Sequence, residues 1–71
     1  MDWRKSVGQN VRRIRLERGF SQQKVAADSE IDLTYLSGIE RGLRNPSLLV
    51  MARIADALAV DLAALVTREG S

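Results

Sequence analysis

The fold of this chain is decided by the stretch SQQKVAADSEIDLTYLSGIERGLRNPS, residues 21–47. Ser21 and Asp32 favour the N-cap position, where a side-chain oxygen accepts a hydrogen bond from a backbone N–H of the first helical turn. Each is followed by a segment suited to a short helix, and Gly42 comes after the second segment, where a left-handed residue can end it. The stretch therefore predicts two short helices joined by a turn.

The first of these helices is expected over residues 22–29 and the second over residues 33–41. Ala26 and Ala27 are small enough to let the two helices approach each other closely. Two short helices, a turn of about three residues and small side chains at the packing point are what a helix-turn-helix requires. We therefore expect this motif over residues 21–41.

Before this stretch, a longer helix is expected over residues 3–18. Val7, Val11 and Ile14 lie at the i, i+4, i+7 spacing that places side chains on one face of a helix, so they form an apolar stripe. Gly19 follows at a position where a left-handed residue can end the helix.

Two more helices are expected after residue 47. Ser47 can cap a helix that extends to about Leu58, and Asp61 can cap a last short helix over residues 62–67. No segment shows the period-2 alternation of a β-strand. The fold class expected is all-α, a compact five-helix bundle.

The whole chain, residues 1–71, is long enough for one domain, with a frayed tail over residues 68–71. It contains no cysteine and no histidine, which excludes disulfides, thiolate nucleophiles, zinc fingers and imidazole general bases. No carboxylate pair, glycine-rich phosphate loop or metal-ligand cluster stands out either. We therefore expect no catalytic activity, no cofactor, no metal and no small-molecule ligand.

The longest apolar run, residues 48–52, is far shorter than the ~20 residues of a membrane-spanning helix, so no membrane partner is expected. The opening segment is charged and lacks the apolar core of a signal peptide. Both observations, together with the absence of disulfides, suit a cytoplasmic protein.

Charge is distributed unevenly along the chain, whose formal net charge is +2. Residues 1–24 hold seven basic and two acidic groups, a net of +5, and residues 25–71 hold four basic and seven acidic groups, a net of −3. This asymmetry predicts an electropositive face built from the first part of the chain. A solvated basic helix surface explains the charge alone equally well.

The chain resembles the Cro/CI-type (xenobiotic-response-element) family of bacterial and phage DNA-binding domains, which have the lambda-repressor-like fold. The resemblance covers about residues 7–66. Several motifs carry it in the right order and spacing: IRLERG (14–19), SQQKVA (21–26), YLSGIERGLRNPS (35–47) and IADAL (54–58). Residues 32–49 are especially similar to the controller proteins of restriction–modification systems.

This resemblance implies a transcriptional regulator that binds double-stranded DNA as a homodimer on a near-palindromic operator. By analogy with controller proteins, it would regulate the operon of a restriction–modification or similar system, its own gene included, close to the nucleoid. RNA polymerase is a candidate partner. The alternative is an antitoxin or other protein-binding module that uses the same fold chiefly to hold a partner protein.

The second helix of the motif would lie in the major groove with its N-terminal residues at base edges. Base readout is expected from Leu33, Thr34, Tyr35 and Arg44. Thr34 can offer a hydroxyl hydrogen bond or a methyl contact, whereas Leu33 can offer only an apolar contact, most naturally to a thymine methyl. Arg44 would reach a guanine bidentately or follow a phosphate. Tyr35 would contact a base edge or a phosphate, or else serve as a core aromatic.

Contacts to DNA phosphates are expected mainly from the first turn of the first motif helix and from the end of the second. Gln22 resembles the phosphate clamp of the family. The expected contacts are Ser21, Gln22, Gln23, Ser37, Arg41 and Asn45.

By the same resemblance, Arg15 pairs with Glu40 and ties the recognition helix to the rest of the domain. Two positions depart from the family pattern, since Glu30 and Ala59 stand where glycine is common. If Glu30 adopts a positive φ, the cost is on the order of 1 kcal/mol.

A single motif of this size makes few base contacts, and a second copy related by a two-fold axis doubles them. The candidate interface residues are Leu49, Val50 and Val66, because an exposed apolar patch favours self-association. Leu49 and Val50 fit equally well as core residues. Trp3 would either cover the end of the core or join the partner surface.

Overall fold

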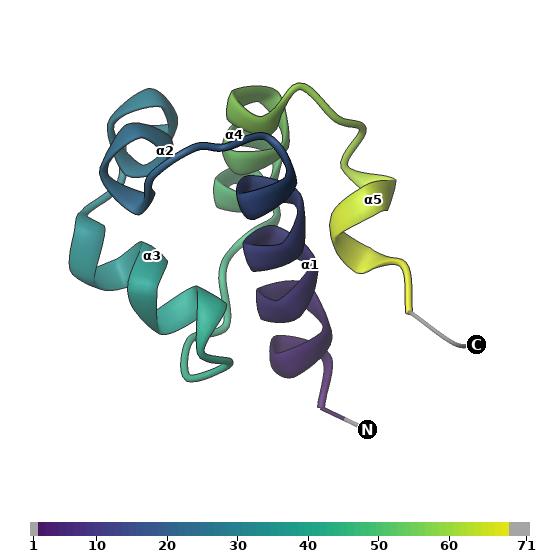
Figure 1. The fold of residues 1–71 in the computed structure, drawn as a ribbon. Helices are drawn as coiled ribbons and strands as arrows, with labels where there is room; N and C mark the ends of the chain where they lie inside the picture. Colours follow the sequence, from purple (N-terminus) through teal and green to yellow (C-terminus); the bar gives the residue numbers. More distant parts are fainter. Residues whose placement is uncertain (1, 69–71) are drawn as a thin grey trace.

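The structure, a computed structural model, describes residues 2–68. Within this range the chain forms five helices and no strand, as the sequence predicts. Their bounds are α1 (Trp3–Glu17), α2 (Gln22–Ser29), α3 (Leu33–Glu40), α4 (Leu48–Leu58) and α5 (Ala63–Val66). In Figure 1, α2 and α3 lie on one side of α1 and α5 lies on the other. The expected frayed tail lies outside the described residues from residue 69 on.

The first four helices begin at capping side chains. Ser21, Asp32 and Ser47 each accept a hydrogen bond, of 3.0, 3.2 and 3.1 Å, from a backbone N–H two or three residues further on. Asp2 caps α1 in the same way and also binds the Arg4 guanidinium, at 3.1 Å. The hydrogen bond from this guanidinium, together with the backbone N–H of Arg4, lowers the pKa of Asp2 below its usual value. Polar side chains thus mark the start of each of these four helices.

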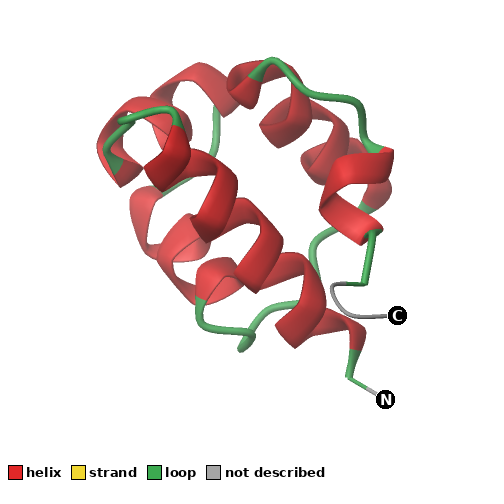
Figure 2. Ribbon diagram, turned by 45° about the vertical axis from the view of Figure 1, so that its right-hand side comes forward, coloured by secondary structure: helices red, strands yellow, loops and turns green. Residues whose placement is uncertain are grey.

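The same four helices end in a common pattern, the Schellman motif. In each, a residue with positive φ follows the last turn, and the backbone N–H groups of that residue and the next one bind carbonyls of the turn. The positive-φ residues are Gly19, Glu30, Gly42 and Ala59. The sequence predicts the glycine positions and anticipates Glu30, whose φ is 59°. Short connections follow, as Figure 2 shows.

The last helix differs from the prediction. The helix predicted over residues 62–67 is present as α5 over Ala63–Val66, but its predicted cap is wrong, because no side chain caps it. Asp61 instead accepts a backbone hydrogen bond at its carbonyl. The chain becomes extended at Thr67, whose carbonyl accepts a 2.7 Å hydrogen bond from Asn10 of α1. The residue that follows the helix is thus held by a tertiary contact.

One apolar core lies between the helices. It consists of Val7, Val11, Ile14, Val25, Ala26, Leu36, Ile39, Ile54, Ala55, Leu58 and Leu65. The apolar stripe predicted on the first helix is part of this core. Ala27 is exposed, so of the two alanines only Ala26 lies at the packing point of α2.

Asn10 is one of the polar residues in this interior. It is buried, and its amide nitrogen donates hydrogen bonds to the carbonyls of Leu65, at 2.9 Å, and Thr67, at 2.7 Å. Asn10 was not predicted as a core residue, although it lies beside Val7, Val11 and Ile14 on the buried face of the same helix. These hydrogen bonds hold the C-terminal segment of the described chain against α1.

Glu30→Gly is expected to stabilise the protein by about 1 kcal/mol, because glycine adopts a positive φ without the steric cost that other residues have. Urea unfolding followed by circular dichroism measures the change. Ala27→Gly, on the exposed face of α2, is the matched control and should destabilise by about the same amount. A Glu30→Gly protein less stable than the unmodified chain would show that the turn is unstrained.

Candidate nucleic-acid interface

Helix α3 presents one exposed strip of polar side chains. Thr34 and Arg41 are exposed and Ser37 is half-buried, and residues three or four apart lie on the same face of a helix. Leu33, at the N-terminal end of α3, is also exposed, at 39% of its surface. The opposite face of α3 is buried in the core. The helix thus offers its N-terminal end and one side to an external partner.

Tyr35 lies at the border of this strip. It is half-buried and packs against the core, so the interpretation as a core aromatic accounts for part of its ring. Its hydroxyl makes no hydrogen bond within residues 2–68. The side chain therefore combines a packing contact with an unengaged polar end.

The orientation of α3 is set by a buried ion pair. Arg15 of α1 donates from Nε to Glu40 Oε2 at 2.7 Å and from Nη2 to Glu40 Oε1 at 3.0 Å. The exposed fractions of the two side chains are only 8% and 1%. Nη1 of Arg15 also donates to the carbonyl of Phe20, at 2.8 Å, just before α2 begins. One guanidinium thus joins α1, the end of α3 and the approach to α2.

Gln22 extends this network towards the surface. Its Nε2 donates a 3.1 Å hydrogen bond to Glu40 Oε1, which the sequence analysis did not foresee. Because an amide nitrogen carries two hydrogens, a second N–H of Gln22 is left for an external acceptor. Ser21 and Gln23 flank it and are exposed, although Ser21 Oγ already accepts a hydrogen bond as the cap of α2.

Gly8 lies where α1 and α3 come closest. A Cβ atom on Gly8 would overlap the carbonyl oxygen of Ile39 and lie 3.0 Å from that of Glu40. This role of Gly8 was not predicted, although a glycine inside a predicted helix can indicate a packing reason for the small residue. Gly8 and the ion pair together determine how α3 is held.

The loop after α3 carries Arg44 and Asn45, both exposed. Among residues 2–68 the Arg44 guanidinium has no hydrogen-bond or ion-pair partner. Lys5 of α1 lies against Gly42 of the same loop, since an added Cβ on Gly42 would be 3.0 Å from Lys5 Cγ. Positive charge therefore gathers where α3 ends.

The electropositive face is smaller than the charge count suggests. Arg4, Arg13, Arg15 and Lys24, all from the basic first part of the chain, have carboxylate partners. The basic groups without an ion pair in the described part of the chain are Lys5, Arg12, Arg18, Arg41, Arg44, Arg53 and Arg68. Three of them, Lys5, Arg41 and Arg44, lie together at the end of α3.

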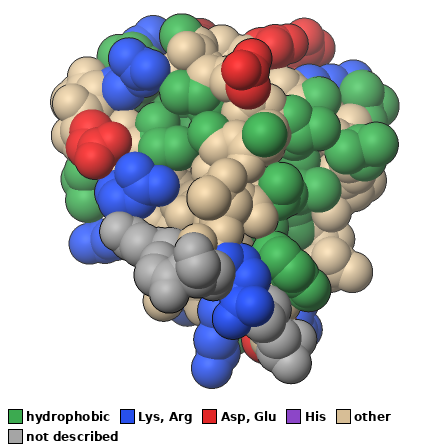
Figure 3. Space-filling view, turned by 90° about the vertical axis from the view of Figure 1, so that its right-hand side faces the viewer, with side chains coloured by type: hydrophobic (Ala, Val, Ile, Leu, Met, Phe, Trp, Pro, Cys, Tyr) green, Lys and Arg blue, Asp and Glu red, His purple; other side chains and the backbone are tan. Residues whose placement is uncertain are grey.

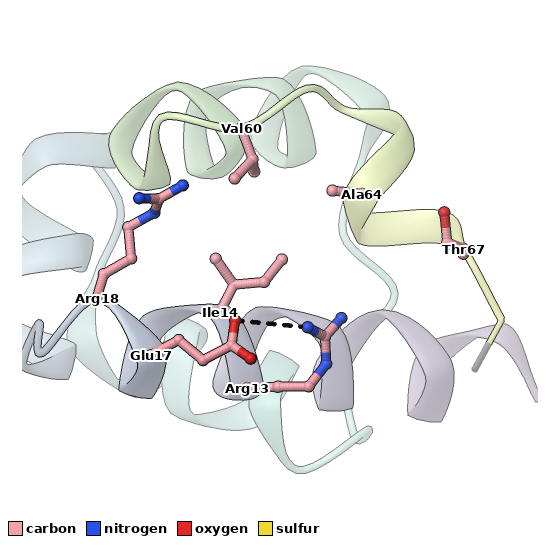
Figure 4. Close-up of a pocket in the computed structure, with 7 residues that line it drawn as sticks. All are labelled: Arg13, Ile14, Glu17, Arg18, Val60, Ala64 and Thr67. Atoms are coloured by element: carbon pink, nitrogen blue, oxygen red, sulfur yellow. Dashed lines mark ion pairs between the residues drawn. The ribbon is translucent and has the colours of Figure 1, made fainter. Parts of the chain in front are cut away.

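A groove of about 480 Å³ lies between α1 and the segment that leads into and includes α5 (Figure 4). Figure 4 shows Ile14 and Val60 pointing into it, with Arg13 and Glu17 paired at 3.6 Å along one edge. Its one carboxylate is thus already engaged. Residues 2–68 contain no group of His, Cys, Asp or Glu side chains that could hold a metal ion.

The candidate dimer residues have different environments. Leu49 is exposed over 61% of its surface, Val66 is exposed over 39%, and Val50 packs partly against the core. A mainly apolar pocket of about 280 Å³ lies nearby, with Trp3, Met51 and Val66 in its wall. Figure 3 shows hydrophobic side chains gathered on the face that includes α5. Trp3 is half-exposed there rather than buried under the core.

Five short helices with a capped helix-turn-helix and an exposed recognition helix define a DNA-binding domain. The helix-turn-helix family model matches residues 11–65, and the chain belongs to this family, of the Cro/CI (xenobiotic-response-element) type. It is a DNA-binding transcriptional regulator.

Similar proteins include the uncharacterized HTH-type transcriptional regulator y4dJ of Sinorhizobium fredii, 46% identical over 94% of this chain and 87% of that protein. The control protein C.BamHI of Bacillus amyloliquefaciens is 48% identical over 76% of this chain and 68% of that protein. Among solved structures, the restriction–modification controller protein C.AhdI of Aeromonas hydrophila superposes with a TM-score of 0.85 at 37% identity, covering 87% of this chain and 94% of that one. No helix among residues 2–68 is long and apolar enough to cross a lipid bilayer.

Proposed function

We propose that this chain binds a near-palindromic operator as a homodimer and regulates the transcription of its own operon, by binding alone and without a chemical step. The observation that carries the proposal is the exposed strip of α3, Thr34, Ser37 and Arg41, held in place by the buried Arg15–Glu40 pair. A rigid, polar helix face beside unpaired cations suits the major groove of DNA. In this role the protein would act in the cytoplasm, where it would bind the DNA of the nucleoid.

Base readout is assigned to the N-terminal end of α3 and to the loop after it, through Leu33, Thr34, Tyr35 and Arg44. Thr34 and Leu33 are exposed and can reach a thymine methyl, and Thr34 can also form a hydrogen bond. The Arg44 guanidinium is unengaged and can bind a guanine bidentately. Tyr35 would contact the DNA through its hydroxyl, which makes no hydrogen bond within residues 2–68.

Phosphate contacts are assigned to Ser21, Gln22, Gln23, Ser37, Arg41 and Asn45. The N-terminus of α2 offers unpaired backbone N–H groups and the positive end of its dipole. Gln22 adds the N–H that Glu40 leaves unused. This arrangement would fix the position of the domain on the duplex and leave sequence selection to α3.

Dimerisation is supported by size and by surface character. The domain measures 31 × 21 × 19 Å, so two copies side by side can place their α3 helices about 34 Å apart, one turn of DNA. Leu49 and Val66 supply exposed apolar area, and Val50 is half-buried against the core. C.AhdI is a restriction–modification controller protein, and the likeness to it supports a role at a restriction–modification operon. RNA polymerase would be the partner during transcription.

Selection of bound fragments from a genomic library at about 100 mM salt, followed by footprinting, tests this function. We expect one or a few enriched sites with two-fold symmetry, and an affinity that falls steeply with salt because neutralised phosphates release counterions. Failure to prefer any duplex would contradict the proposal. Stable binding to a co-expressed protein in place of DNA would favour the antitoxin-like alternative.

Leu49→Asp is expected to weaken self-association by at least about tenfold, because a charge would enter the apolar patch. Sedimentation velocity over a concentration series measures the change. Leu16→Asp, at an equally exposed leucine of α1 outside the proposed interface, is the control and should leave the dimer unchanged. If Leu49→Asp also leaves the dimer intact, this face of α4 is not the interface.

A further inference from the structure

Gly38 is buried although it lies towards the solvent side of α3. It follows Thr34 by four residues and precedes Arg41 by three, so it is a neighbour of both on the exposed strip. The atoms that cover it belong to Arg44. A Cβ atom on Gly38 would lie 2.8 Å from Arg44 Cγ, 3.5 Å from Nε and 3.7 Å from Cδ.

The backbone explains why Arg44 lies there. After α3, the N–H of Gly42 binds the carbonyl of Ile39 at 3.0 Å, and the N–H of Leu43 binds the carbonyl of Gly38 at 2.9 Å. These hydrogen bonds fold the loop back over the last turn of α3. Arg44, the next residue, then has its aliphatic stem against the backbone at Gly38.

We propose that Gly38 is a positioning residue that determines specificity by holding Arg44 in its reading geometry. Because glycine has no Cβ, the space beside the Gly38 backbone is open, and the aliphatic part of the Arg44 side chain occupies it. Because Cγ, Cδ and Nε of Arg44 all lie within 4 Å of the Cβ position of Gly38, the start of the guanidinium is held beside the exposed strip. A long side chain placed before binding loses less conformational freedom on binding, which favours the matched base.

This inference rests on the proposed role of Arg44 in base readout. The new element is that base readout by Arg44 also depends on Gly38, which itself makes no contact with a base. Gly38 does not have a positive φ, so its identity is not required by its backbone conformation. The stem of Arg44 is the nearest neighbour that a larger side chain would meet.

Gly38→Ala is the direct test. The variant should fold with unchanged or higher stability, because alanine favours helix interiors and a flexible arginine can move aside. Its preference at one base pair of each half-site, measured by binding to single-substituted operators, should fall about tenfold. Arg44→Ala should relax the same base pair, and the double variant should be no less selective than Arg44→Ala alone. Ser37→Ala, the adjacent position, should lower affinity uniformly across operators.

A second measurement needs no DNA. NMR relaxation of the Arg44 Nε–Hε group in the uncomplexed protein should report an ordered side chain, and Gly38→Ala should make it mobile on the ps–ns timescale. An Arg44 side chain equally mobile in both proteins would overturn the inference.

The binding results separate the inference from the proposed function. If Arg44→Ala relaxes one base pair and Gly38→Ala does not, the positioning role of Gly38 is wrong and the readout by Arg44 stands. If Arg44→Ala weakens every operator equally, Arg44 is a phosphate contact and both statements about readout are overturned.

Discussion

Arg15→Leu is expected to leave much of the protein unfolded at room temperature. The substitution leaves the Glu40 carboxylate buried without its partner, and breaking a buried pair in this way costs about 3–5 kcal/mol. It also removes the hydrogen bond to the Phe20 carbonyl. Small domains have stabilities near the lower end of about 5–15 kcal/mol, so little would remain. Urea unfolding with a circular dichroism signal measures the loss.

Two further variants test the cause. Arg12→Leu, on the exposed face of the same helix, should change stability by less than about 0.5 kcal/mol. The double variant Arg15→Leu/Glu40→Leu should recover much of the lost stability, because two apolar side chains remove the uncompensated charge. A double variant as unstable as Arg15→Leu alone would show that the geometry of the pair, and not its charge balance, holds α3.

Gly8→Ala is expected to destabilise the protein by about 2–3 kcal/mol, which lowers the Tm by roughly 10–20 °C in a domain of this size. Helix propensity alone would make the alanine variant more stable by up to about 1 kcal/mol. Packing reverses the sign, because the new methyl group would overlap the carbonyl oxygen of Ile39, a backbone atom that cannot move aside cheaply. Thermal unfolding monitored by circular dichroism measures the shift.

Gly38→Ala is the matched control for this prediction. It makes the same change inside another helix, but the new methyl group meets a flexible side chain and not backbone. The two variants should therefore move the Tm in opposite directions, or Gly38→Ala should leave it unchanged. A Gly8→Ala protein as stable as the unmodified chain would mean that α1 and α3 can separate slightly without loss.

Much of the fold was predictable because local signals specify most of it. Ser21, Asp32 and Ser47 mark the helix starts with side chains that act on their own next turn, and the stripe of α1 identifies its buried face. The cap of the last helix was predicted wrongly because Asp61 binds Ala64 through its backbone carbonyl and not through its side chain. A segment of this length also carries too few residues for periodicity to be informative.

The site was predictable to a different extent. The exposed strip of α3 follows from helical spacing once the core face is recognised, and Glu40 was expected to meet Arg15 from the family resemblance. The link from Gln22 to Glu40 and the contact between Arg44 and Gly38 arise only when separate segments are brought together. The need for glycine at position 8 could not be predicted either, because it comes from the short distance between the backbones of α1 and α3.

The helix ends have a consequence for how this sequence can vary. Each end is closed by its own hydrogen bonds, so substitutions at separate ends should add in free energy. Glu30 and Ala59 already occupy left-handed positions without being glycine. A Cβ atom on Gly19 would have no neighbour within 4 Å, so this glycine can also be replaced. The only cost is that of a positive φ in a residue other than glycine. Gly42 cannot be replaced in this way, because Lys5 lies against it. Evolution is therefore freer at the end of α1 than at the end of the recognition helix.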